Sequence, residues 1–460
     1  MARVALVEPG APGTHLFSRF RLPRLGLPSI GAVLTRAGHA VRIYCEGVLR
    51  VALDHLRDAD IVGISTTTST APRAYEIADF CRAAGIPTVI GGPHATFMLE
   101  EALEHADYCV RGEGEVVFPQ LVERLEARAP VSDLPGVLTR DGGSPSTALC
   151  RVPDLDTLPF PDLRLIEGWR EQPIMPVMTS RGCPHKCRFC SVTAMFGRRY
   201  RFRSPQSVIE ELKWLQPRRV FFYDDDFCAN RQRTRELLEQ MLRQDVTPPW
   251  TAQVRADVAR DRELVALMHR ARCRRVYVGY ESISPTTLAA MGKHQSVEDI
   301  VESVRVFHEH GIGVHGMFMF GSDEDDAESV QATLAFARRH EIDTVQFMAL
   351  TPLPGTPVFD SLSEENRLFE RDWSFYDGHH VVFLPRRLTP LALQQAICAA
   401  QERFYSWWAC VKDFAQLRFG NGFLKAYGRC LLGRWRRENV AFLSRLHQIA
   451  ATWTGGSDPV

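Results

Sequence analysis

The sequence has no long apolar run, no excess of one charge and no internal repeat, and each absence excludes a class of protein. No stretch approaches the ~18 uninterrupted apolar residues that a membrane-spanning helix needs. The 55 Lys and Arg residues balance the 55 Asp and Glu residues, so the bulk charge does not indicate nucleic-acid binding. We therefore expect a globular protein whose function resides in particular sites.

A disulfide framework is also missing. Residues 1–10 form too short an apolar run for a signal peptide and are typical of a buried strand ended by Pro-Gly, so we expect a cytoplasmic protein. Most of the 12 cysteines stand singly in apolar segments, as small buried hydrophobes do. In a reducing cytosol, a tight cluster of cysteines indicates a metal or redox site rather than disulfides.

The chain of 460 residues, at about 150 residues per domain, predicts roughly three structural units of the α/β class. Residues 1–127 alternate short apolar runs with amphipathic helices, which predicts a Rossmann-like parallel sheet covered on both faces. Residues 128–170 are rich in Pro, Asp and Gly and predict a linker. Residues 171–385 contain six strand-like runs separated by helices, which describes a partial (β/α)6 barrel. Residues 386–460 predict a helical, aromatic and basic segment.

Small and polar residues follow the predicted strands of the first unit, at the sheet edge where ligands of parallel sheets bind. Glycine lets a backbone approach a bulky ligand, and hydroxyls supply neutral hydrogen bonds. Ordinary turn chemistry explains any one of these loops alone, whereas several loops on one edge favour a ligand site. The candidate ligand-binding residues are Ser65, Thr66, Gly91, Gly92, His94, Gly112 and Glu113.

Cys183, Cys187 and Cys190 follow the first predicted barrel strand with the spacing C-x3-C-x2-C. Three thiolates do not complete a tetrahedral zinc site, but they can hold three irons of a four-iron cluster and leave the fourth iron open. An open iron suits chelation by the amino and carboxylate groups of S-adenosylmethionine (SAM), which brings the sulfonium close enough for one-electron cleavage. A zinc site completed by His185 is the alternative, and the position of the loop after a barrel strand disfavours it.

Together with Phe189, the aromatic residue before the last cysteine, this segment resembles the radical SAM superfamily, and the likeness extends to about residue 385. Members cleave SAM reductively to methionine and a 5′-deoxyadenosyl radical, which abstracts a hydrogen atom from the substrate. The resemblance implies that Cys183, Cys187 and Cys190 bind a [4Fe-4S] cluster. It also implies an external electron donor such as a flavodoxin or ferredoxin.

Residues at the ends of the next predicted strands are suited to binding SAM. Asp224 and Asp225 end the second strand, where the superfamily commonly contacts the SAM ammonium, and a carboxylate there would pair with its charge. Gln253 and Arg255 end the third strand, and the guanidinium can meet the SAM carboxylate in two places. Glu281 ends the fourth strand and suits the ribose hydroxyls or the methionyl amine. Each of these carboxylates can instead cap the helix that follows.

Segments 25–31, 37–39, 91–94 and 112–115 resemble the cobalamin-binding domain fused to class B radical SAM methyltransferases and to anaerobic porphyrin ring cyclases. The motif Asp-x-His-x-x-Gly, which supplies the lower axial histidine in the wider cobalamin family, is missing, and His15 lacks the aspartate that would orient it toward cobalt. The resemblance implies that cobalamin is bound and that an unactivated carbon of a small-molecule or lipid-like substrate is methylated.

The motifs leave other reactions open. Ring formation or rearrangement would use the same scaffold. A tRNA methylthiotransferase would need a second cluster on three N-terminal cysteines, and Cys45, Cys81 and Cys109 are present in number, although Cys81 falls within a predicted helix. A noncatalytic cobalamin or SAM sensor would not cleave SAM.

The segment after the barrel allows two interpretations. Arg and Trp residues on its helices suit either peripheral contact with a membrane and a greasy substrate or a simple cap on the barrel. His379 and His380 either line the substrate cavity or satisfy local hydrogen bonds.

Overall fold

The computed structural model describes residues 1–14, 16, 22–141 and 148–452; His15 lies outside this part of the chain. The chain divides into two compact units. The first unit comprises Met1–Pro12, Phe20–Pro184 and Ser191–Tyr223. The second unit comprises Gly13–Arg19, His185–Cys190 and Asp224–Val460. Each unit is described by itself.

The N-terminal sheet has six strands in the order β2-β1-β3-β4-β5-β6. The first five strands run parallel, and β6 pairs antiparallel with β5. The central strand β1 pairs on both sides, with Val4 opposite Val41 on one neighbour and Ile61 on the other. This confirms the predicted parallel sheet, and β6 is an addition that lies in the expected linker. The strands are β1 (Arg3–Glu8), β2 (Ala40–Cys45), β3 (Ile61–Ser65), β4 (Thr88–Gly91), β5 (Tyr108–Val110) and β6 (Val137–Thr139).

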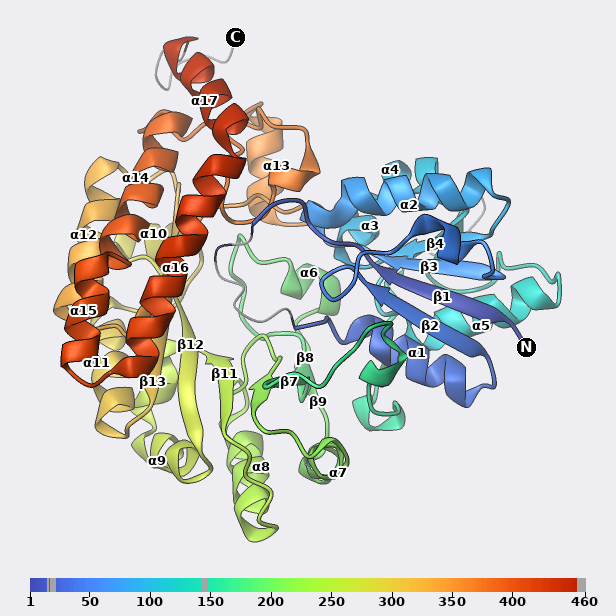
Figure 1. The fold of residues 1–460 in the computed structure, drawn as a ribbon, viewed down its shortest axis with the longest axis horizontal. Helices are drawn as coiled ribbons and strands as arrows, with labels where there is room; N and C mark the ends of the chain where they lie inside the picture. The colour runs from blue at the N-terminus through green and yellow to red at the C-terminus, as the bar shows by residue number, and fades with distance from the viewer. Residues whose placement is uncertain (15, 17–21, 142–147, 453–460) are drawn as a thin grey trace. The chain divides into compact units, whose positions relative to one another are not determined.

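Helices cover both faces of this sheet: Figure 1 shows α1 and α5 on one face and α2 and α4 on the other. Leu6 of β1, Leu34 of α1 and Leu121 of α5 are fully buried in the core on the first face. Burying each such side chain contributes roughly 1.5–3 kcal/mol. The helices are α1 (Gly26–Arg36), α2 (Ala71–Ala83), α3 (Pro93–Phe97), α4 (Leu99–His105) and α5 (Gly114–Glu126).

The second sheet contains six strands in the order β7-β10-β11-β12-β13-β14, and the pairs β7–β10, β11–β12, β12–β13 and β13–β14 are parallel. It ends at β7 and β14 in the described chain rather than closing on itself, so the predicted partial barrel is confirmed. A separate two-stranded ribbon joins β8 to β9. The strands are β7 (Met175–Val177), β8 (Ser180–Arg181), β9 (Arg201–Phe202), β10 (Val220–Phe222), β11 (Trp250–Val254), β12 (Cys273–Glu281), β13 (Gly313–Phe320) and β14 (Thr344–Ala349).

The helices between these strands begin at conventional caps. Ser204 accepts a hydrogen bond from the backbone N–H of Ser207, with Pro205 in the first turn, as the sequence predicts. The helices are α6 (Val192–Phe196), α7 (Pro205–Leu215), α8 (Arg231–Arg243), α9 (Arg262–Arg270), α10 (Pro285–Ala290), α11 (Val297–Glu309), α12 (Ala327–Arg339) and α13 (Pro357–Glu364).

The chain continues into four helices after the barrel strands, as predicted: α14 (Pro390–Phe404), α15 (Trp407–Ala415), α16 (Phe419–Glu438) and α17 (Val440–Thr452). Helix α14 packs on β14 and α12, and α15 lies against α16 (Figure 1). None of the helices in the described ranges is both long and apolar enough to cross a membrane.

Candidate functional site

The cysteine motif lies on the loop between β8 and α6. Cys183, Cys187 and Cys190 are half-buried, so all three thiols stay accessible to a metal cluster. The backbone N–H of Cys190 donates to the carbonyl of Cys187 over 3.2 Å, which closes a tight turn between these two ligands. Gly182 opens the loop with φ +86, a conformation that favours glycine.

The stretch from His185 to Cys190 is anchored in the second unit. The N–H of Arg188 donates to the carbonyl of Met291 over 3.0 Å, and the Arg188 carbonyl accepts from the N–H of Val358 over 3.4 Å. Phe189 packs against an apolar cluster that includes Met291 and Leu350. The aromatic residue of the motif therefore holds the loop in place, and a loop held by backbone bonds on two sides is a rigid support for thiolate ligands.

Three aspartates in a row follow β10 and concentrate negative charge. Asp224 and Asp226 are 1% and 3% exposed, whereas the side chain between them, Asp225, is exposed. Desolvation of the Asp225 carboxyl by the surrounding protein raises its pKa to about 7. The negative charges of Asp224 and Asp226 add to this shift. His185 Nε2 lies 3.6 Å from Asp226 Oδ2, so the histidine of the cysteine loop has a carboxylate beside it. A cationic ligand group would relieve this repulsion.

The end of β11 positions two predicted SAM-binding residues. The carbonyl of Gln253 accepts from the N–H of Phe227 over 2.9 Å, which ties this strand end to the aspartate turn. Arg255 is 8% exposed, and its Nη2 donates to the carbonyl of His294 over 3.2 Å. Its Nε lies 3.6 Å from Asp257 Oδ1. The guanidinium is thus oriented by the protein itself, as a carboxylate-binding group should be.

Glu281 lies at the end of β12 in an unusual conformation. Its φ is +62, and the pairing register with β13 shifts between Gly279 and Glu281. Its Oε1 is 2.8 Å from Lys293 Nζ, and both side chains are buried. A Cβ at Gly279 would lie 2.5 Å from the same Glu281 oxygen, so a side chain there would displace the ends of Glu281 and Lys293. Strained residues cluster at functional sites, and the partner Lys293 is a site residue that sequence reasoning missed.

Loops at the end of the N-terminal sheet hold one another closely. Thr66 Oγ1 donates to the carbonyl of Gly91 over 2.9 Å and accepts from the N–H of Ala95 over 3.2 Å. Gly92 has φ +92, and a Cβ there would lie 2.5 Å from the Thr66 carbonyl oxygen. The carbonyl of Ser65 accepts from Arg24 over 3.4 Å. Gly92 is therefore required by contact with the protein's own backbone.

Gly112 and Glu113 have similar structural partners. A Cβ at Gly112 would clash with the carbonyl oxygen of Cys150. Glu113 accepts from Arg201 over 2.9 Å and from the N–H of Val152 over 2.5 Å, and Arg181 lies 3.4 Å away. Burial alone would raise the pKa of Glu113, but the bond from Arg201 and the charge of Arg181 lower it below its usual value.

Histidines near the predicted sites have partners of their own. The Nε2 of His94 lies 3.1 Å from the Tyr75 hydroxyl, and the ring is 1% exposed. His380 bonds to Asp377 over 2.9 Å and to Asn439 over 2.8 Å. His379 Nε2 accepts from the N–H of Leu16 over 3.2 Å. The last two side chains thus satisfy local hydrogen bonds within the second unit.

The three cysteines considered for a second cluster do not converge. Cys81 and Cys109 are fully buried and Cys45 is 2% exposed. Burial raises the pKa of each thiol to about 12, which disfavours the thiolate that a metal needs. In the described chain they form no group with ligand atoms within 4.8 Å of one another. The geometry argues against a methylthiotransferase.

Two protein families match this chain. Residues 177–337 match the radical SAM superfamily. Residues 18–122 match the B12 binding domain. The matched regions contain the cysteine loop with the strand ends that follow it, and the loops at the end of the N-terminal sheet.

Curated relatives include methyltransferases and a cyclase. An uncharacterised methyltransferase of Pyrococcus horikoshii is 32% identical over 363 residues, covering 76% of this chain and 79% of that protein. The hopanoid C-3 methylase of Methylococcus capsulatus is 27% identical over 442 residues, covering 91% of this chain and 84% of that protein. The anaerobic magnesium-protoporphyrin IX monomethyl ester cyclase of Cereibacter sphaeroides is 30% identical over 370 residues, covering 74% of this chain and 60% of that protein.

Solved structures share the fold. The radical SAM methyltransferase TsrM of Kitasatospora setae, with cobalamin and a [4Fe-4S] cluster bound, aligns with a TM-score of 0.66 and 19% identity over 79% of this chain and 76% of its own. The cobalamin-dependent SAM radical enzyme OxsB, with aqua-cobalamin bound, aligns with a TM-score of 0.72 and 16% identity over all of this chain and 77% of its own.

Proposed function

This chain belongs to the radical SAM superfamily, in the group with an N-terminal B12 binding domain, and from this premise we propose that it is a cobalamin-dependent C-methyltransferase. The observation that carries the proposal is the anchored loop with three accessible cysteines in a chain that also contains a B12 binding domain. When bound, the cluster supplies the electron that cleaves SAM, and cobalamin supplies the methyl carrier.

In this proposal, residues of the chain bind and orient the cluster, SAM and cobalamin. The three thiolates of Cys183, Cys187 and Cys190 fit a cluster with one open iron. The aspartate turn after β10 suits the ammonium of SAM, and the guanidinium of Arg255 suits its carboxylate. We propose that the residues that bind or surround SAM are Phe189, Asp224, Asp225, Gln253, Arg255 and Glu281. We assign cobalamin to the loops that contain Ser65, Thr66, Gly91, Gly92, His94, Gly112 and Glu113.

The contacts described above divide the cobalamin assignment into two groups. Thr66, His94 and Glu113 have buried side chains engaged by protein partners, and Gly112 is buried against the backbone of Cys150, so these four residues support the loops that face the ligand. Ser65, Gly91 and Gly92 are partly exposed at the strand ends, and the two glycines carry no side chain, so a bulky macrocycle can approach the chain closely there. Direct contact is therefore assigned to the second group.

The substrate class in the proposal is a small, lipid-like molecule. A relative named hopanoid C-3 methylase aligns with 91% of this chain, a span long enough to include part of α14–α17. An external flavodoxin or ferredoxin would reduce the cluster, which places the reaction in the reducing cytoplasm. Methyl transfer to an unactivated carbon needs no acidic proton on the substrate, so a catalytic base is not part of the proposal.

The proposal is tested by label transfer. Reconstituted protein is incubated without oxygen with cobalamin, a reductant, methyl-labelled SAM and a lipid extract. Label in an apolar product supports methylation of a lipid-like substrate. The Cys187→Ala variant should lose all label, whereas Cys430→Ala, an exposed cysteine on α16, should retain it. An altered apolar product that carries no label would favour the ring-forming or rearrangement reaction instead.

A further inference from the structure

The outer side of α15 and α16 exposes large apolar side chains. On α15, Trp407, Trp408 and Val411 fall on one side, and Trp408 is 73% exposed. On α16, Phe419, Phe423 and Tyr427 recur every four residues, which places them on one side of that helix. The connecting turn adds Leu417, which is 75% exposed. We call these seven residues the aromatic face.

The aromatic face is continuous across the two helices. The ring of Phe414, on α15, lies 6.3 Å from that of Phe419 and 5.1 Å from that of Phe423. The opposite sides of the helices are buried, with Cys410 of α15 and Trp435 of α16 facing the rest of the second unit. The aromatic face is therefore what remains after these helices pack, and apolar patches of this kind mark interaction sites.

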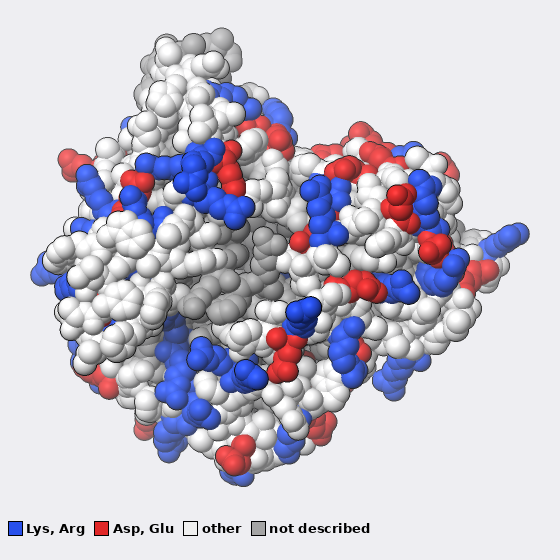
Figure 2. Space-filling model, viewed as in Figure 1, with Lys and Arg blue, Asp and Glu red and all other residues white. Residues whose placement is uncertain are grey.

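The helices that carry this face are strongly basic, although the whole chain is neutral. Residues 407–438 contain seven Lys and Arg residues and only two acidic ones, Asp413 and Glu438. Lys425 is paired with Asp413 and Arg434 with Glu438. Among the described residues, Lys412, Arg418 and Arg437 form no ion pair, and all three are exposed. Figure 2 shows the broad uncharged area over α15 and α16 with Lys and Arg beside it.

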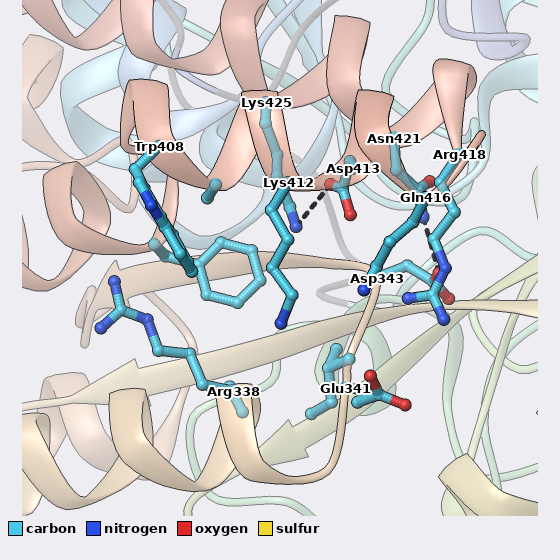
Figure 3. A pocket seen from close by; sticks show the side chains of 14 residues that line it. Arg338, Glu341, Asp343, Trp408, Lys412, Asp413, Gln416, Arg418, Asn421 and Lys425 are labelled. Atoms are coloured by element: carbon cyan, nitrogen blue, oxygen red, sulfur yellow. Dashed lines mark hydrogen bonds and ion pairs between the residues drawn. The ribbon is translucent and has the colours of Figure 1, made fainter.

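A pocket lined by both apolar and charged side chains lies beside the aromatic face (Figure 3). Trp408 lines one side of it, and Lys412 reaches into it. Three acidic residues line it: Asp413 lies 2.7 Å from Lys425, Asp343 accepts from Asn421 over 2.7 Å, and Glu341 is the third. Lys412 is exposed and follows Trp408 by one turn of α15, so a basic group stands next to the aromatic face.

We propose that the aromatic face docks on an anionic lipid bilayer, with the aromatic rings in the interface and the basic residues on lipid phosphates. Trp and Tyr favour the headgroup level, and Lys and Arg are attracted to anionic lipid. A second copy of the chain is disfavoured because it would bring two positive faces together. The proposal concerns a surface, and it stands or falls independently of the methyl-transfer reaction.

The test is sedimentation of the full chain with lipid vesicles, which requires no catalysis. Vesicles of phosphatidylglycerol and phosphatidylcholine should bind the protein, vesicles of phosphatidylcholine alone should bind it far less, and added salt should release it. The double variant Trp407→Ser, Trp408→Ser should weaken binding at least tenfold. Loss of one basic residue should weaken vesicle binding roughly fivefold. The double variant Lys412→Glu, Arg418→Glu removes two basic residues and adds two acidic ones, so it should weaken vesicle binding by more than that.

Matched controls come from α7, where Lys213 and Trp214 are also exposed. Lys213→Glu and Trp214→Ser should leave vesicle binding unchanged. Unchanged melting temperatures would show that the α15 variants still fold. The proposal is overturned if neutral and anionic vesicles bind equally, or if neither binds. It is also overturned if light scattering finds a dimer that Trp407→Ser, Trp408→Ser dissociates.

Discussion

Replacing Gly92 by Ala should destabilise the N-terminal unit strongly. Gly92 has φ +92 and ψ 178, a region that almost only glycine adopts, and a Cβ there would lie 2.5 Å from the carbonyl oxygen and 2.8 Å from the nitrogen of Thr66. The backbone conformation costs about 1–3 kcal/mol, and the forced displacement of backbone about the same again. The sum of about 2–6 kcal/mol is a large part of the 5–15 kcal/mol that stabilises a typical domain.

The matched control is Gly38→Ala, because Gly38 has φ +91 but nothing within 4 Å of its Cβ position. It should show only the conformational cost, about 1–3 kcal/mol. Urea denaturation of the cobalamin-free chain, followed by hydrogen exchange in β3 and β4, measures both variants. If Gly92→Ala proves no worse than Gly38→Ala but weakens cobalamin binding, then Gly92 serves the ligand and our packing argument is wrong.

Three further variants test the electrostatics of the sites. Asp225→Asn should remove the part of the pH dependence of stability that this carboxyl causes. Because the pKa of Asp225 is raised to about 7 in the folded protein, the free energy of unfolding of the wild type falls as pH rises from about 4 to 7. In the variant, the melting temperatures at pH 5 and pH 8 should therefore converge. Lys293→Met leaves the buried Glu281 without its partner and should cost about 3–5 kcal/mol in urea denaturation, partly recovered by adding Glu281→Gln. Arg201→Met should cost a similar about 3–5 kcal/mol. Because the pKa of Glu113 is lowered in the folded protein, the wild type should lose this stability on acidification, and the variant should show a smaller loss between pH 7 and pH 4.

The sheets and the cysteine loop were predictable because their signals are local. Short apolar runs such as that of β3 remain strands when buried, and the spacing of Cys183, Cys187 and Cys190, together with their place after a predicted strand, predicts a cluster with an open iron. The strand β6 was not predicted, because its three residues are ordered by pairing with β5 rather than by their own pattern.

Long-range partners could not be predicted. Glu113 meets Arg201, which lies 88 positions away, and nothing in either segment indicates the pair. Lys293 neutralises Glu281 across a loop and a short helix. The sequence suggested that Gly92 and Gly112 allow close approach to a ligand, which stays a prediction, and the structure adds a reason for glycine that the sequence did not reveal, close approach to the backbone of Thr66 and Cys150. A glycine in the sequence indicates that something approaches the backbone closely, but it does not identify whether that is a ligand or another part of the chain.

The most direct test of the central claim is the product analysis of SAM turnover. Cluster-reconstituted protein is incubated without oxygen with SAM and a reductant, with and without cobalamin. We predict 5′-deoxyadenosine in both reactions and S-adenosylhomocysteine only when cobalamin is present, with both products lost in Cys187→Ala. Formation of 5′-deoxyadenosine without any S-adenosylhomocysteine in the presence of cobalamin would contradict the assignment as a methyltransferase.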